Sequence, residues 1–129
     1  MRYISLPALF GFWFFTPNIA QGAGDVIRIG VLNDQSALYA DFGGRTSVDA
    51  ARLAVEDFGG KVLGRPIEII SADHLNKPDV ASAIARRWFD VEGVGAVTDL
   101  TNSAVALAVQ QIAKDQGKIT LSVGQRRRD

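Results

Sequence analysis

The sequence predicts an α/β protein built on an open parallel sheet with helices on both faces. Short β-branched apolar segments alternate with longer segments whose apolar residues recur every three or four positions. No tight-turn signal joins consecutive strands, so we expect parallel strands linked by right-handed crossovers. Counted along the chain, the expected strand order is 2-1-3-4, which places a topological switch point between the first and third strands.

The first strand and helix are expected within residues 26–58. Residues 26–32 (VIRIGVL) form a nearly continuous apolar run, which is typical of a strand covered on both faces. Residues 46–58 then fit one helix, capped by Thr46 or Ser47 and ended by Gly59 and Gly60. Its apolar stripe is expected to consist of Val48, Ala51, Val55 and Phe58.

The same alternation continues through the rest of the chain. Further strands are expected at residues 66–72, 94–98 and 118–123. Asn76-Lys77-Pro78 opens a second helix, with proline in the first turn. Asn102 or Ser103 is expected to cap a third helix that ends near Gly117. The residues expected to be buried are Val80, Ile84, Trp88 and Val91 on the second helix, and Val105, Val109 and Ile112 on the third.

The N-terminus has the three regions of a secretory signal peptide. Arg2 precedes an apolar run at residues 3–15, which is too short to cross a bilayer comfortably. Small residues follow, so we expect residues 1–22 to be a cleaved signal, with cleavage after Gly22 and with Ala20 or Ala23 as alternatives. A buried N-terminal helix and an uncleaved anchor are the other two interpretations. Export to the periplasm is therefore expected.

Composition excludes several classes of function. The chain has 129 residues, no cysteine, and 14 basic against 14 acidic residues. The lack of cysteine removes disulfides, a thiol nucleophile and lipid attachment through cysteine. The balanced charge argues against nucleic-acid binding. No phosphate-binding glycine motif is present, and His74, the only histidine, is expected to be solvated in a loop, so no cofactor or metal is predicted.

Asp34 and Asp99 follow the first and third strands, so both are expected near the switch point. Phosphorylated receiver domains place carboxylates there, and Ser122 could supply their hydroxyl. However, Asp34 lacks an acidic neighbour, and no fifth strand carries the lysine that a receiver needs. A receiver is therefore a minor alternative.

Two loops at the carboxyl end of the predicted sheet are suited to holding a ligand. Residues 33–42 form a long strand-to-helix connection in which Tyr39 offers a ring and a hydroxyl. Residues 99–103 lead into a helix N-terminus, where free amides and the Ser103 hydroxyl can bind a carboxylate. Ser103 could equally serve only as a helix cap, and the two roles are compatible.

Residues 27–124 resemble the N-terminal lobe of periplasmic substrate-binding proteins for branched-chain amino acids and short amides. The resemblance rests on IRIGVLNDQSALYADFGG, VDAARLAVEDFGGKVLGRPIEII, SADHLNKPDVASAIARRWFDVEGV and TNSAVALAVQQIAKDQGKITLSVG. It implies a non-enzymatic solute-binding protein with two lobes, which works with the membrane permease of an ABC importer. Carried over by position, it implies that the ligand contacts are Tyr39, Thr101, Asn102, Ser103, Ser122 and Gly124.

The sequence departs from that family after Gly124, where residues 125–129 (QRRRD) replace a fifth strand, a hinge and a second lobe. We therefore expect residues 23–124 to be a partial lobe and residues 125–129 an aberrant tail. One wall of a cleft is expected to bind weakly or not at all, unless another chain supplies the other wall. A non-functional fragment from truncation or a frameshift is the main alternative. A secreted hydrolase ranks last, because no nucleophile elbow is present.

Overall fold

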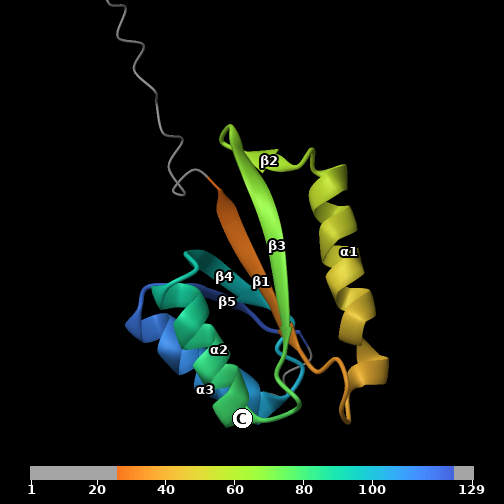
Figure 1. Ribbon diagram of the computed structural model, residues 1–129, viewed down its shortest axis with the longest axis vertical. Helices are drawn as coiled ribbons and strands as arrows, with labels where there is room; N and C mark the ends of the chain where they lie inside the picture. The colour runs from red at the N-terminus through yellow and green to blue at the C-terminus, as the bar shows by residue number, and fades with distance from the viewer. Residues whose placement is uncertain (1–25, 124–129) are drawn as a thin grey trace, which may run out of the picture.

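The computed structural model describes residues 26–123 of the chain (Figure 1). The expected signal peptide at residues 1–22, Gly124 and the tail at residues 125–129 lie outside the described residues. The elements are β1 (Ile27–Asn33), the 3-10 helix η1 (Ala40–Phe42), α1 (Gly44–Asp57), β2 (Lys61–Val62), β3 (Arg65–Asp73), α2 (Pro78–Asp90), β4 (Val94–Thr98), α3 (Ser103–Asp115) and β5 (Ile119–Leu121).

The sheet has the order β2-β3-β1-β4-β5. β3, β1, β4 and β5 are parallel, which confirms the predicted order 2-1-3-4 of the four predicted strands. The prediction missed β2, which pairs antiparallel with the start of β3 through the turn at Leu63 and Gly64. Leu63 has a positive φ of 51° in that turn. A leucine is uncommon in this conformation, and for that reason the hairpin carries no ordinary sequence signal.

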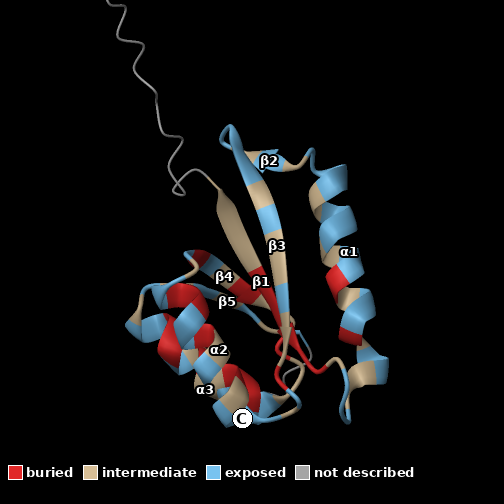
Figure 2. Ribbon diagram, viewed as in Figure 1, coloured by how far each residue is buried: buried red, intermediate tan, exposed pale blue. Residues whose placement is uncertain are grey.

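Helices cover the two faces of the sheet unequally. α1 lies on one face, over β1 and β3, while α2 and α3 pack together on the other face (Figure 1). Buried residues gather on the α2 and α3 side (Figure 2), where one apolar cluster joins these helices to the sheet. Its large members are Leu32, Trp88, Phe89, Val94, Val97, Leu100, Val105, Val109 and Ile112. The three residues predicted to be buried on α3 are among them.

Gly30 lets the central strand approach α2 closely. A Cβ atom at this position would overlap the six-membered ring of Trp88. The ring therefore packs directly over the backbone of β1, at a point where any side chain would push it away. A glycine in the middle of a strand often marks such an approach.

Several local expectations were wrong. α1 begins at Gly44 rather than Thr46, and its N-cap is Gly43, so neither Thr46 nor Ser47 caps it. Phe58 and Val91 lie just after their helices, at the C-cap positions, and are mostly exposed. On α1 only Val48 of the predicted stripe is fully buried.

The α1 side of β5 carries exposed apolar residues. Ile119 and Leu121 are 59% and 60% exposed. Their backbone partners in β4 are Ala96 and Thr98, while α1 lies over the other half of the sheet. No helix within residues 26–123 is both long enough and apolar enough to span a membrane.

Candidate functional site

Polar residues from three strands meet at the carboxyl end of the sheet. Asn33 ends β1, Asp73 ends β3, and Asp99 follows β4. The Asn33 Nδ2 atom donates hydrogen bonds to Asp99 Oδ2 at 2.8 Å and to the Gly44 carbonyl at 2.6 Å. This contact places the ends of β1 and β4 together at the switch point, as the predicted topology required.

Asp34 organises the long loop after β1. The side chain is fully buried, and its two oxygens accept hydrogen bonds from the backbone N–H groups of Ala37 at 2.7 Å and Tyr39 at 2.8 Å. Its carboxylate is therefore committed to shaping the loop that carries Tyr39. This role argues further against the receiver interpretation, which needs a carboxylate free for phosphate chemistry.

Asp73 ties that same loop to β3. Its carboxylate accepts hydrogen bonds from the Ser36 hydroxyl at 2.6 Å and from the N–H groups of Leu75 at 2.8 Å and Gln35 at 3.1 Å. Burial raises the pKa of Asp73, but these hydrogen bonds outweigh burial and hold its pKa below the usual value. The sequence analysis did not single out Asp73. Its position at the last residue of a strand was the signal that could have identified it.

His74 is fully buried, which contradicts the expectation of a solvated loop histidine. Its Nδ1 atom accepts the Asn76 N–H at 3.0 Å, so the imidazole is neutral and carries its proton on Nε2. Burial lowers the pKa of His74 below the ordinary value, and the nearby Asp34 and Asp73 carboxylates offset only part of that effect. The prediction failed because His74 extends the pairing of β3 with β1, and its N–H bonds the Asn33 carbonyl at 3.0 Å.

The N-terminus of α3 holds three of the predicted ligand contacts. Asn102 caps the helix, because its Oδ1 atom accepts the N–H groups of Ala104 at 2.7 Å and Val105 at 3.2 Å. Its Nδ2 atom donates to Asn76 Oδ1 at 2.5 Å. Ser103 is thus relieved of the capping role and is exposed, and the Thr101 Oγ1 atom is buried without a hydrogen-bond partner among the described residues.

The remaining predicted contacts lie on the loops beside this helix. Ser122 follows β5, is half-buried, and its hydroxyl accepts a hydrogen bond from Gln110 of α3 at 3.2 Å. Tyr39 is half-buried in the loop after β1, and its ring meets Phe42 edge-on with centroids 6.2 Å apart. The backbone N–H of Asp99 bonds the Leu121 carbonyl at 3.2 Å, which joins the loops after β4 and β5.

Backbone strain and unpaired polar atoms gather at this end of the sheet. Leu75, Asn76 and Asp99 adopt positive φ angles of 53°, 56° and 65°. Such conformations are costly for residues other than glycine and concentrate at functional sites. Besides Thr101, the buried side-chain atoms without a partner in the described part of the chain are Asn33 Oδ1, Gln35 Nε2 and His74 Nε2.

The arrangement suits polar recognition rather than metal chemistry. Within residues 26–123, no group of three or more His, Cys, Asp or Glu side chains could hold a metal ion. Two grooves among the described residues lie along β3, and neither is lined by Ser103 or Ser122. At the carboxyl end of the sheet, the Ser103 hydroxyl is exposed, the Thr101 hydroxyl is buried, and the Ser122 hydroxyl is bonded to Gln110.

Comparison with known proteins identifies the family. The sequence profile of the family described as periplasmic binding protein matches residues 26–128. The chain belongs to the periplasmic binding protein family. No curated protein sequence matches it.

Solved structures of periplasmic binding proteins share the fold. A periplasmic binding protein from Burkholderia mallei is 46% identical, with a TM-score of 0.76 over 80% of this chain and 27% of that chain. A branched-chain amino acid ABC transporter ligand-binding protein from Burkholderia xenovorans is 50% identical, with a TM-score of 0.70 over 73% of this chain and 25% of that chain. A leucine-binding protein from Thermotoga maritima is 26% identical, with a TM-score of 0.67 over 74% of this chain and 27% of that chain.

The chain thus spans about a quarter of the length of these periplasmic binding proteins. The relatives are solute-binding proteins and not enzymes, one of them belongs to an ABC transporter, and the family is periplasmic.

Proposed function

We propose that this chain forms one wall of the ligand cleft in the solute-binding component of an ABC importer. The observation that carries the proposal is the N-terminus of α3, where Asn102 does the capping and leaves the Ser103 hydroxyl exposed. The unpaired Thr101 Oγ1 lies two residues earlier, and Ser122 lies on the adjoining loop after β5. Together they offer hydroxyl groups beside the positive end of a helix dipole.

A carboxylate or amide oxygen is the ligand group that this chemistry favours. A helix N-terminus with nearby hydroxyl donors stabilises negative charge without needing a basic side chain. Relatives support this choice: one from Streptococcus pneumoniae is solved with isoleucine and one from Rhodopseudomonas palustris with benzoate. Both ligands carry a carboxylate. The proposed ligands are branched-chain amino acids, short amides or urea-like molecules.

Tyr39, Asn102 and Gly124 complete the proposed contacts. Tyr39 is held by its N–H bond to the buried Asp34, which fixes its backbone at the rim of the sheet. Asn102 keeps its side chain engaged within the protein, so its proposed contribution is its backbone and the orientation of the helix. A periplasmic location after cleavage of residues 1–22, and a membrane permease as partner, belong to the same proposal.

Amide NMR tests the site even when binding is weak. We expect titration with isoleucine, benzoate, acetamide or urea to shift the backbone amide signals of Ser103 and Ser122. Ser103→Ala and Thr101→Val are expected to weaken binding several-fold, since each lost hydrogen bond is worth about 1 kcal/mol. Ser82→Ala is the matched control, because that hydroxyl bonds the Pro78 carbonyl on α2.

Two results would contradict the proposal. One is the absence of any shift at millimolar ligand in a sample whose amide spectrum shows it to be folded. The other is a set of shifts confined to the grooves along β3, because these would place the ligand elsewhere.

A further inference from the structure

The outer edge of β3 is left open by the described residues over its second half. β2 pairs only with Arg65 and Pro66, and the Ile67 N–H bonds the Gly60 carbonyl at 2.9 Å. Alternate residues of a strand direct their backbone groups to the same side, so the N–H and C=O groups of Ile69 and Ser71 also point outward. No residue within 26–123 bonds to them.

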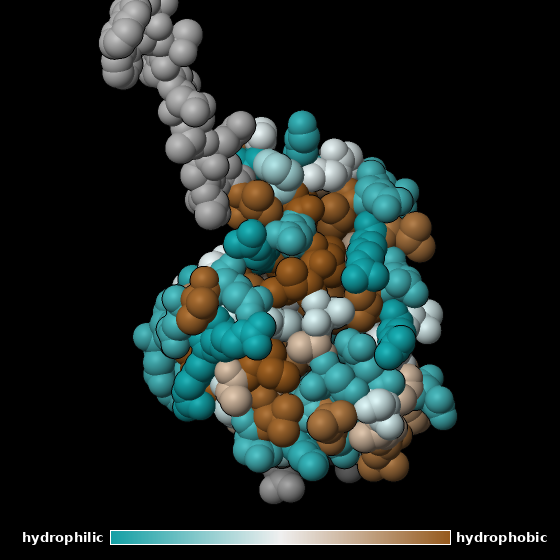
Figure 3. All heavy atoms as spheres, in the orientation of Figure 1, coloured by the Kyte–Doolittle hydropathy of each residue, from teal (hydrophilic) through white to brown (hydrophobic). Residues whose placement is uncertain are grey.

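The open stretch carries none of the usual features that block edge pairing. Ile69, Ile70, Ser71 and Ala72 include no charge, proline or bulge. Figure 3 shows a band of hydrophobic residues running between the hydrophilic surfaces of the two sides. Ile67, Ile69 and Ile70 are only half-buried.

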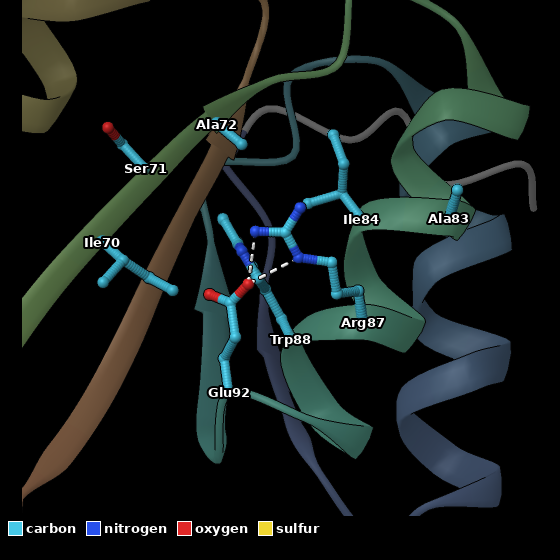
Figure 4. A pocket seen from close by; sticks show the side chains of 8 residues that line it. All are labelled: Ile70, Ser71, Ala72, Ala83, Ile84, Arg87, Trp88 and Glu92. Atoms are coloured by element: carbon cyan, nitrogen blue, oxygen red, sulfur yellow. Dashed lines mark hydrogen bonds and ion pairs between the residues drawn. The ribbon is translucent and has the colours of Figure 1, made fainter.

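A groove flanks this edge on each face of the sheet. On the α2 side, Ile70 and Ala72 of β3 face Ile84 and Trp88, and the ion pair between Arg87 and Glu92, at 2.6 Å, lies between them (Figure 4). On the α1 side, the groove beside Ser71 is lined by Arg45, Asp49 and Arg52. A partner that pairs with β3 would therefore meet apolar side chains and one internal ion pair on the α2 face, and a charged surface on the α1 face.

The charges on α1 alternate in sign along the side that faces the groove. Arg45, Asp49 and Arg52 follow one another at helical spacing, and Glu56 continues the same face one turn later. In two antiparallel copies of this helix, Arg45 would lie opposite Glu56 and Asp49 opposite Arg52. The surface is thus complementary to itself.

A single twofold axis would allow both the pairing of two β3 strands and the antiparallel alignment of two α1 helices. α1 runs antiparallel to β3: its start is near the end of β3 through the Asn33 bond to Gly44, and its end is near Ile67 through Gly60. The middle of α1 therefore lies beside Ile70. An axis through Ile70, perpendicular to the sheet, would pair Ile69 with Ser71 of the second copy and also align the two α1 helices antiparallel.

We propose that the β3 edge is a homodimer interface, in which two copies join their sheets through antiparallel β3 strands. Pairing would satisfy the outward backbone groups of Ile69 and Ser71 and cover the half-buried isoleucines. The α1 charges would select an identical, antiparallel partner. The other exposed apolar edge, β5, is only three residues long and offers less pairing.

Charge exchange on α1 tests this interface by analytical ultracentrifugation from micromolar to millimolar concentration. We expect the wild-type chain to dimerise, and more weakly at high salt. Arg45→Glu with Arg52→Glu makes the α1 side wholly acidic, and Asp49→Arg with Glu56→Arg makes it wholly basic. Each variant alone should raise the Kd at least about tenfold, because attraction becomes repulsion.

Mixing the acidic and basic variants should restore dimers, now as heterodimers. Circular dichroism checks that each variant is folded, and the restored assembly is itself evidence of folding. A wild-type chain that sediments as a monomer throughout would overturn the proposal. A dimer that both variants leave unchanged would place the contact elsewhere, for example at β5, and would overturn it equally.

Discussion

At the scale of single residues, His74 couples stability to pH. The imidazole is buried and neutral, and burial lowers its pKa in the folded chain below the ordinary value of 6.5. The unfolded chain binds a proton there more readily, so the free energy of unfolding should be constant above neutral pH and fall as the pH drops below about 6.5. Because one proton is involved, the free energy of unfolding can change by at most about 1.4 kcal/mol per pH unit.

Urea denaturation at a series of pH values measures that slope. His74 is the only histidine, so the window between pH 5 and the ordinary histidine pKa belongs to it. His74→Asn keeps an acceptor for the Asn76 N–H but cannot titrate, and it should flatten the curve in this window. An unchanged slope in the variant would assign the effect to other groups. Asp73 acts in the same direction but at lower pH: its pKa is lowered in the folded chain, so its stabilisation is present above the ordinary pKa of 3.8 and is lost as the pH falls below that value.

Prediction from sequence succeeded at this scale where a residue acts on its near neighbours. The cap of α3 was expected to be Asn102 or Ser103, and Asn102 takes that role, because a capping side chain reaches only the next helical turn. His74 was misjudged because its burial depends on a turn at Leu75 and Asn76 with positive φ angles, and on β1, which is distant in sequence. Whether Ser103 and Ser122 contact a ligand still rests on the resemblance and on the proposed test.

At the scale of elements, the packing of β1 against α2 depends on Gly30. We expect Gly30→Ala to destabilise the chain by about 1–3 kcal/mol, because the added methyl group overlaps the Trp88 ring. Gly95→Ala is the matched control in β4, since its Cβ would meet only an ordinary contact at 3.9 Å from the Arg28 carbonyl. Urea denaturation measures both.

A double-mutant cycle isolates the contact. The cost of Gly30→Ala should shrink markedly in a Trp88→Leu background, where the smaller side chain leaves room for the methyl group. Equal costs in the two backgrounds would show that the glycine is needed for backbone freedom instead of close packing.

Element prediction was accurate where the period of apolar residues was strong. The buried residues on α3 were predicted correctly, because that stripe packs against both α2 and the sheet. The start of α1 was not, because Gly43 and Gly44 adopt backbone angles that depend on the bonded Asn33 side chain. β2 was missed because two residues are too few to produce a period.

At the scale of the whole molecule, the sheet is covered unevenly. The strand order followed from handedness and the alternation of segments, whereas the exposure of β5 on its α1 side depends on how far α1 extends across the sheet. Leu121 is 60% exposed there, so Leu121→Lys should change the free energy of unfolding by no more than about 0.5 kcal/mol while reducing aggregation.

Urea denaturation and light scattering at high protein concentration check that expectation. The same substitution at Leu32, which is fully buried, is the control and should unfold the chain. If Leu121→Lys were equally damaging, that face of β5 would have to be covered.

The central position of β1 also bears on the order of events during synthesis. β1 leaves the ribosome before the other described strands. Its partner in β3 for Ile27 is Ile67, 40 residues later, and its partner in β4 for Arg28 is Val94, 66 residues later. Both edges of β1 pair with segments that are distant in sequence. Long loops must therefore close before the sheet can form, and such closure is slow. The nascent chain therefore stays extended and threadable until most of it has been translated.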